Sequence, residues 1–121
     1  MKSIANLTFE PGEKVDGLFE VPGTGFTLPA TIIAGEKEGK TVLLTAGVHS
    51  CEYVGIQTLQ ELRKELTPAD ITGTLVIIPV VNRTGFENRT PTIVPEDGKN
   101  LNRVFPGKAN GFASEKLAWF M

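Results

Sequence analysis

The only histidine of this chain, His49, stands three residues before Glu52 in the segment TAGVHSCEYVG. Zinc accepts both an imidazole nitrogen and a carboxylate oxygen, and catalytic zinc sites often combine two histidines with a glutamate and leave one position for water. The pair has a second interpretation, in which Glu52 offsets the dipole of a following helix and His49 is an ordinary hydrogen-bonded polar side chain. The spacing alone leaves both interpretations open.

A second set of polar side chains lies in the segment NRTGFENRTPTIVPEDGKNLNRVFPGK. Its candidate binding residues are Arg83, Arg89, Asn100, Asn102 and Arg103. The planar fork of arginine suits the capture of a carboxylate by two parallel hydrogen bonds, and a neighbouring amide can add another. For each arginine taken alone, a solvated surface charge is the better interpretation. Gathered opposite a metal-binding pair, they indicate a site for an anionic ligand.

The chain between these sets predicts elements that bring them together. The apolar run from Lys40 to His49 predicts a central strand buried on both faces. An apolar stripe from Glu52 to Leu66 predicts a helix that Ser50 can cap, and the run from Gly73 to Asn82 predicts a second strand. This βαβ order favours parallel strands. Since ligands bind beyond the carboxyl ends of such strands, both sets should be neighbours.

The remaining sequence predicts shorter elements. Gly and Pro interrupt the first forty residues, which indicates short strands and turns, with Pro29 at an edge or a bulge. The segment from Asn82 to about Gly111 predicts a long functional loop. The final segment FASEKLAWFM predicts a helix that starts near Ala113 or Ser114. The expected fold class is α/β, with a mixed, largely parallel sheet flanked by helices.

The composition and charge of the chain argue against several classes of function. The chain has 121 residues, 40% of them hydrophobic and 21% charged, as expected for one soluble domain. Its net charge of −2 gives no basic surface for nucleic acid. One cysteine cannot form an internal disulfide, and the N-terminus lacks the apolar run of a secretion signal. These features predict a cytoplasmic protein without membrane segments. Neither a P-loop nor a dinucleotide-binding motif is present.

Two motifs, GVHSCEYVGIQTL and DGKNLNRVFPG, resemble the succinylglutamate desuccinylase and aspartoacylase family, which is related to zinc carboxypeptidases. The similarity runs from about Lys40 to Gly107 and includes the order and separation of the motifs. The resemblance implies that His49 and Glu52 are zinc ligands and that Asn102 and Arg103 hold the carboxylate of the substrate. It also implies an upstream arginine that stabilises the oxyanion. Arg89 fits that role best by position, with Arg83 as the alternative.

Two positions depart from the family pattern. The family often has an aspartate where Asn100 stands, which can accept a hydrogen bond from the free nitrogen of the zinc-bound histidine. An asparagine oxygen can do the same without the charge, so its effect on His49 should be milder. Cys51 replaces a frequent Gly or Asn, and we interpret it as a small packed residue rather than a nucleophile.

The resemblance implies a zinc-dependent hydrolase that cleaves an amide bond next to a carboxylate, such as a deacylase of N-acyl amino acids. The family also needs a second histidine ligand and a glutamate base, and this chain has no other histidine. We therefore expect residues 1–121 to form the N-terminal part of one zinc carboxypeptidase-like catalytic domain, inactive alone and weak in zinc binding. The alternatives are a non-catalytic module of the same fold that binds carboxylates, and a plain α/β structural domain.

Overall fold

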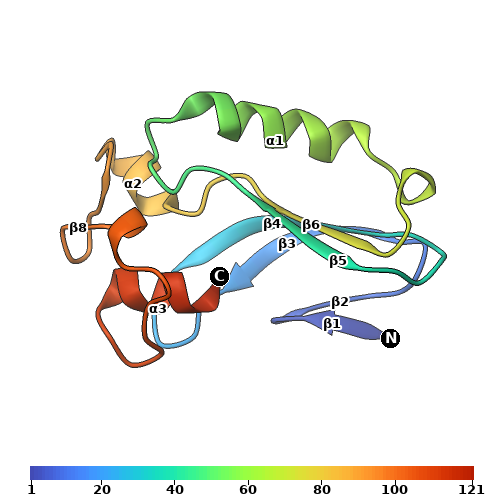
Figure 1. Cartoon of the computed structure of the whole chain (residues 1–121), viewed down its shortest axis with the longest axis horizontal. Coiled ribbons are helices and arrows are strands. Elements are labelled where there is room, and N and C mark those ends of the chain that lie inside the picture. The colour runs from blue at the N-terminus through green and yellow to red at the C-terminus, as the bar shows by residue number, and fades with distance from the viewer.

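The computed structural model describes residues 1–121 and is built around a four-stranded sheet. In spatial order its strands are β3 (Lys14–Glu20), β4 (Thr27–Ala34), β6 (Thr74–Ile78) and β5 (Thr41–Thr45). One face is covered by helix α1 (Tyr53–Glu65). The opposite side carries the hairpin β1 (Lys2–Ile4) and β2 (Leu7–Phe9) and the terminal helix α3 (Ala113–Phe120) (Figure 1). The sheet therefore lies between two layers, each incomplete.

Several short elements follow β6 and gather at one end of the sheet (Figure 1). They are α2 (Arg83–Asn88), β7 (Ile93–Val94), β8 (Lys99–Asn100) and a 3-10 turn (Leu101–Arg103). The predicted long loop from Asn82 to Gly111 is thus partly ordered into secondary structure. Its elements have two to six residues, which is too short to show an apolar period.

The predicted βαβ unit is confirmed, because β5, α1 and β6 follow one another and β5 pairs in parallel with β6. The expectation of a largely parallel sheet is wrong. Both β3–β4 and β4–β6 are antiparallel, which leaves one parallel pair. The reason is that the strands before residue 40 are joined by short turns, and a parallel connection needs a longer crossover.

The predicted central position of the first apolar strand is also wrong. In this chain β5 is an edge strand, and Val42 and Leu43 remain 48% and 43% exposed. By contrast, all five residues of β6 are buried between β4 and β5. An apolar run indicates that a strand can be buried, but it does not say whether neighbours are available on both sides.

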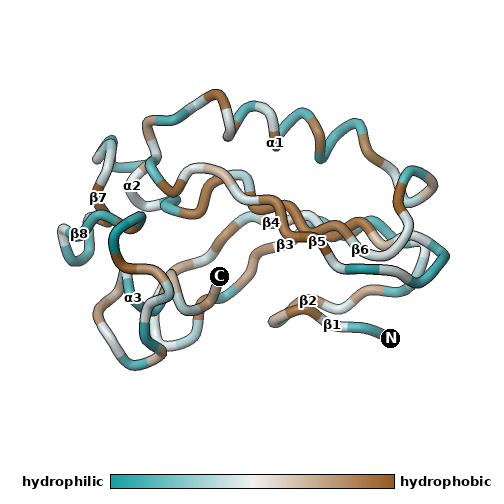
Figure 2. The backbone as a smooth tube through the Cα atoms, viewed as in Figure 1, coloured by the Kyte–Doolittle hydropathy of each residue, from teal (hydrophilic) through white to brown (hydrophobic).

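Alternating side chains of the inner strands divide the core into two clusters. Ile33, Leu75 and Ile77 point toward α1 and pack with Leu59 of that helix. Their neighbours Ile32, Val76 and Ile78 belong to a larger cluster on the other face, which also contains Leu117 of α3. Figure 2 shows the hydrophobic colour concentrated along these strands. Because successive side chains of a strand point to opposite faces, the same strands pack against α1 on one face and against α3 on the other.

Two local predictions can be compared directly with the structure. Pro29 pairs with Leu18 of β3, while β6 joins β4 only from Thr31 onward, so the proline occupies an edge position as predicted. That position requires no amide donor from Pro29 on the β6 side. The terminal helix begins at Ala113, also as predicted. No helix of the structure has the length and apolar character needed to cross a lipid bilayer.

Candidate active site

The His49–Glu52 segment connects the end of β5 to α1. Its turn places Nδ1 of His49 3.3 Å from Oε2 of Glu52. The histidine side chain is 19% exposed and the glutamate side chain 67% exposed. Helix α1 begins one residue after Glu52 and has no side-chain cap at its N-terminus. The predicted cap by Ser50 is therefore wrong, because the Ser50 hydroxyl donates to the Thr90 carbonyl instead.

The second nitrogen of His49 contacts the loop that follows β6. Nε2 lies 2.9 Å from Oδ1 of Asn100, and the same oxygen accepts a hydrogen bond from the backbone N–H of Asn102. Since that backbone group can only donate, the asparagine atom is the acceptor and Nε2 of His49 carries the proton. In a neutral imidazole, Nδ1 then has a free lone pair directed toward Glu52.

This arrangement fits a divalent metal ion. A lone pair on Nδ1 and a carboxylate oxygen are both acceptors, so a cation between them would satisfy both. Two ligands about 2.0–2.1 Å from one tetrahedral zinc lie roughly 3.3 Å apart, which agrees with the separation of Nδ1 and Oε2. No group of three or more His, Cys, Asp or Glu side chains is gathered anywhere in the chain. The donor set therefore fits zinc but contains two ligands.

Arg89 is brought close to this segment. It ends helix α2 in the left-handed conformation, with φ 57° and ψ 38°. With Ser50, Cys51, Tyr53, Phe86 and Pro91 it lines a cavity of about 380 Å³. Its guanidinium forms no hydrogen bond or ion pair with another protein group. It is therefore available to an anionic ligand.

Arg83 is committed to the fold instead. Its Nη1 donates to the carbonyl and the hydroxyl of Thr27, at 3.0 and 2.8 Å, and its Nε forms an ion pair with Glu87. These bonds attach helix α2 to strand β4. Of the two arginines considered for the oxyanion role, Arg83 is thus bonded to other protein groups, whereas Arg89 lies exposed beside the cavity.

Asn102 and Arg103 follow Asn100 directly in the 3-10 turn, and both side chains are exposed. Leu101 between them is fully buried and anchors the turn. The turn thus presents an amide and a guanidinium beside the asparagine that holds His49. The sequence motif is brought into one place with the His49–Glu52 pair, as the resemblance predicts.

Asp97 supports the turn that leads to Asn100, and the sequence analysis did not identify it. Its carboxylate accepts hydrogen bonds from the backbone N–H groups of Lys99 and Ser114, at 3.0 and 2.8 Å. Burial alone would raise the pKa of Asp97, but these hydrogen bonds and the nearby Lys99 charge hold that pKa below its ordinary value. It also caps α3, whose first flanking residue Phe112 has no polar side chain.

Asn82 was also missed as a structural residue. It is fully buried where the chain leaves β6. Its side-chain oxygen accepts from the Gly85 N–H, and its amide donates to the Ile93 carbonyl. An asparagine directly after an apolar strand is a common helix cap, so this pattern could have identified it.

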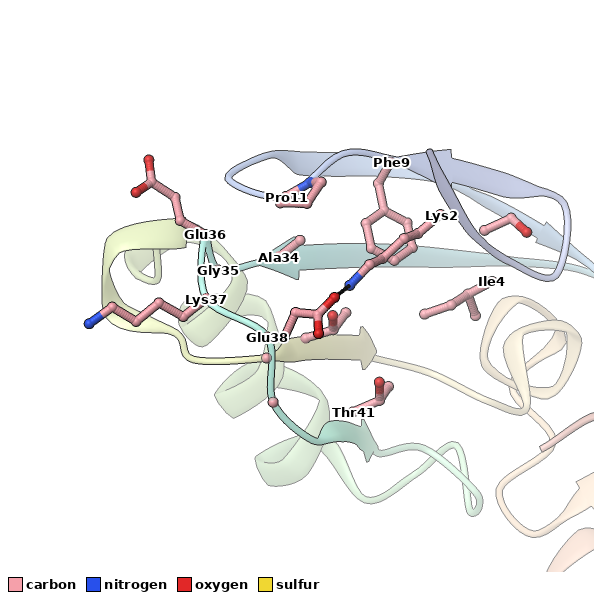
Figure 3. Close-up of a pocket in the computed structure, with 14 residues that line it drawn as sticks. Lys2, Ile4, Phe9, Pro11, Ala34, Gly35, Glu36, Lys37, Glu38 and Thr41 are labelled. Atoms are coloured by element: carbon pink, nitrogen blue, oxygen red, sulfur yellow. Dashed lines mark ion pairs between the residues drawn. The ribbon is translucent and has the colours of Figure 1, made fainter.

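Another cavity lies far from these residues, beneath the β1–β2 hairpin at the opposite end of the sheet. It also measures about 380 Å³, and an ion pair of 3.9 Å between Lys2 and Glu38 crosses it (Figure 3). Figure 3 shows Phe9 and Ala34 on its inner wall, with charged side chains around its opening. None of the residues of the two motifs lines it.

Comparisons with known proteins agree with the motifs. A family model for the succinylglutamate desuccinylase/aspartoacylase catalytic domain matches residues 38–120. N-alpha-acetyl-L-2,4-diaminobutyric acid deacetylase of Halomonas elongata is 42% identical over 91 residues, which cover 75% of this chain and 26% of that protein. The chain thus spans about a quarter of the length of this curated relative.

Solved structures give the same result for the fold. A succinylglutamate desuccinylase from Silicibacter matches 99% of this chain with a TM-score of 0.84 and 31% identity, and the match covers 39% of that chain. The product-bound ectoine utilization protein EutE (DoeB) of Ruegeria pomeroyi matches 95% of this chain with a TM-score of 0.83 and 30% identity, and the match covers 37% of that chain.

Proposed function

This chain belongs to the succinylglutamate desuccinylase/aspartoacylase family, and on that premise we propose that it supplies part of the active site of a zinc-dependent hydrolase. The proposed reaction is cleavage of an amide bond next to a carboxylate. In this proposal residues 1–121 are the N-terminal part of one zinc carboxypeptidase-like catalytic domain. The observation that carries the proposal is the orientation of the His49 ring between Asn100 and Glu52.

His49 and Glu52 would hold the zinc ion in this proposal. The hydrogen bond from Nε2 of His49 to Asn100 selects the tautomer in which Nδ1 is a ligand. Bound zinc supplies a water of lowered pKa and polarises a carbonyl oxygen. The second histidine and the general base that the family uses are not among the residues of this chain. We expect the 121-residue chain alone to bind zinc weakly and to be inactive.

Three further side chains have proposed roles toward the substrate. The free guanidinium of Arg89 donates hydrogen bonds to the oxygen of the scissile carbonyl as negative charge develops there. Asn102 and Arg103 bind the substrate carboxylate, and the rigid arginine fork fixes its orientation. Such a set orients a small anionic substrate against the metal-binding pair.

For the substrate we propose an N-acetylated amino acid. The support comes from the relative that is 42% identical, whose name states a deacetylase of N-alpha-acetyl-L-2,4-diaminobutyric acid. The family model, which matches residues 38–120, includes Asn102 and Arg103, the residues that would contact the carboxylate. The side-chain preference depends on residues outside this chain, because the relatives are more than twice as long.

The test of the metal site is isothermal titration of zinc into the metal-free chain and three variants. His49→Ala and Glu52→Gln should each abolish the weak binding. Glu61→Gln makes the same chemical change on an exposed residue of α1 and should leave binding unchanged. Indistinguishable titrations of the chain and His49→Ala would contradict the metal site. The non-catalytic carboxylate-binding module would then be the better interpretation.

A further inference from the structure

Two separate segments carry the candidate site, and few contacts join them directly. The His49–Glu52 segment follows β5, and the segment from Arg89 to Pro91 follows α2. From the contacts between them we infer that Ser50 is a positioning residue, which holds the Arg89 segment at a fixed place beside the His49–Glu52 pair. This inference rests on the proposed function in so far as Arg89 acts on a ligand there.

The Ser50 hydroxyl forms the best protected of these contacts. Its Oγ donates to the carbonyl oxygen of Thr90 at 2.7 Å, and Ser50 is only 3% exposed. That length is typical of a well-formed O–H···O hydrogen bond. A bond partly shielded from water in this way is stronger than one at the surface, and its loss leaves the half-buried Thr90 carbonyl without this donor.

The other contacts between the two segments are weaker. The backbone N–H of Cys51 donates to the Pro91 carbonyl at 3.4 Å, which is long for a hydrogen bond. Tyr53 and Phe86 meet edge to face with ring centroids 6.0 Å apart, but both rings are largely exposed. Neither contact can replace the buried bond of Ser50.

Thr90 is a suitable point of attachment because two further hydrogen bonds connect it to its own loop. Its N–H donates to the Gly85 carbonyl at 2.9 Å, and its hydroxyl donates to the Ile93 carbonyl at 3.0 Å. Arg89 is the preceding residue, and its own side chain has no protein partner that could fix it. The Ser50 bond to Thr90 therefore holds Arg89 beside His49, in addition to the backbone bonds from Val81 to Ala46 and from Asn82 to Gly47 that join the exits of the two strands.

The proposed role can be tested in the 121-residue chain by NMR, without measuring catalysis. Ser50→Ala removes the hydroxyl and introduces no extra volume. The matched control is Thr58→Ala, since the Thr58 hydroxyl also donates to a backbone carbonyl at 2.7 Å, but on the exposed side of α1. Two quantities are compared: the backbone order parameters of Arg89 and Thr90, and the affinity for acetate, followed at the Arg89 Nε–H signal.

We expect Ser50→Ala to lower the order parameters from about 0.85, typical of rigid backbone, toward 0.6. Acetate affinity should fall about threefold to tenfold, because Arg89 then occupies the binding position for only part of the time. Thr58→Ala should change neither quantity. Unchanged order and affinity in Ser50→Ala, or equal changes in both variants, would overturn the inference.

If the unmodified chain does not bind acetate at Arg89, the role of Arg89 in the proposed function fails, and the order parameters alone then decide the role of Ser50. The two failures can thus be distinguished. A purely structural effect of Ser50 would lower the unfolding midpoint of the whole chain without a selective change at Arg89 and Thr90, and that result would also count against the inference.

Discussion

Strands β5 and β6 lie side by side and run in parallel, and each leads into one half of the candidate site. Their sequences are similarly apolar, but their surroundings differ. All of β6 is buried between two strands, while β5 is paired on one side and exposes Val42 and Leu43. The comparison shows that the half of the site with Arg89 and Asn100 follows a central strand, whereas the half with His49 follows an edge strand.

The different burial of β5 and β6 affects how firmly each half of the site is held in place. The β6 half is supported by both hydrophobic clusters and by the buried side chain of Asn82. The β5 half depends on contacts that cross to the other half, through Ser50 and His49. An edge strand separates from its sheet by local unfolding more easily than a central strand does. The position of His49 therefore depends more on these contacts with the other half of the site.

The largest expected effect contrasts equivalent truncations in the two strands. Ile77→Ala in β6 removes a fully buried side chain and should destabilise the chain by about 3 kcal/mol, because it creates a cavity. Leu43→Ala in β5 should cost less than about 1 kcal/mol, since that side chain is already 43% exposed. Urea unfolding of both variants measures the difference. Equal losses would show that β5 is as well buried as β6 in solution.

A second prediction concerns the exit from β6. Asn82→Ala removes the cap of α2, leaves the Gly85 N–H without its partner, and removes one of the two donors to the Ile93 carbonyl. We expect a loss of about 2 kcal/mol, from one cap and one buried hydrogen bond. Asn88→Ala is the control, since Asn88 bonds to the Thr84 carbonyl at an exposed position. If thermal unfolding gave similar shifts for both, Asn82 would not be the support proposed for this half.

The smallest expected effect is a pH dependence of the free energy of unfolding, and it comes from Asp97 in the β6 half of the site. Because the pKa of Asp97 is lowered in the folded state, its carboxylate stabilises the fold above the ordinary aspartate pKa. That contribution is lost as the pH falls through the lowered folded value. Asp97→Asn should therefore cost less than about 1 kcal/mol at pH 7, and the difference from the unmodified chain should shrink as the pH falls below 3.8, the ordinary aspartate pKa.

The control for this pH dependence is Glu65→Gln, which changes an exposed carboxylate at the end of α1. Its effect on the free energy of unfolding should be smaller than that of Asp97→Asn, because the exposed Glu65 carboxylate accepts no hydrogen bond from the backbone. A difference between Asp97→Asn and the unmodified chain that stayed constant from pH 7 to pH 3 would show that the charge of Asp97 does not act as described.

Residue pattern predicted much of the site and part of the fold. The strand, helix, strand order was correct because apolar period is a local property of each segment. The approach of His49 to Asn100 was predicted through the family resemblance and is present in the structure. The roles of Ser50 and Asp97 were missed, since each depends on a backbone group distant in the chain and no short motif encodes such a partner. Asn82 was missed although its place after an apolar run is typical of a helix cap.

By itself, the sequence determined the strand, helix, strand order of residues 40–82 and the terminal helix, the family that the chain belongs to, and which residue types can bind a metal ion and a carboxylate. These follow from local periodicity and from two motifs whose spacing is specific. Only the tertiary structure decided that β5 lies at an edge, that Arg83 is committed to Thr27 while Arg89 is free, and that Ser50 links the two halves. These depend on which backbone groups and neighbouring strands meet in space, and sequence spacing does not specify that.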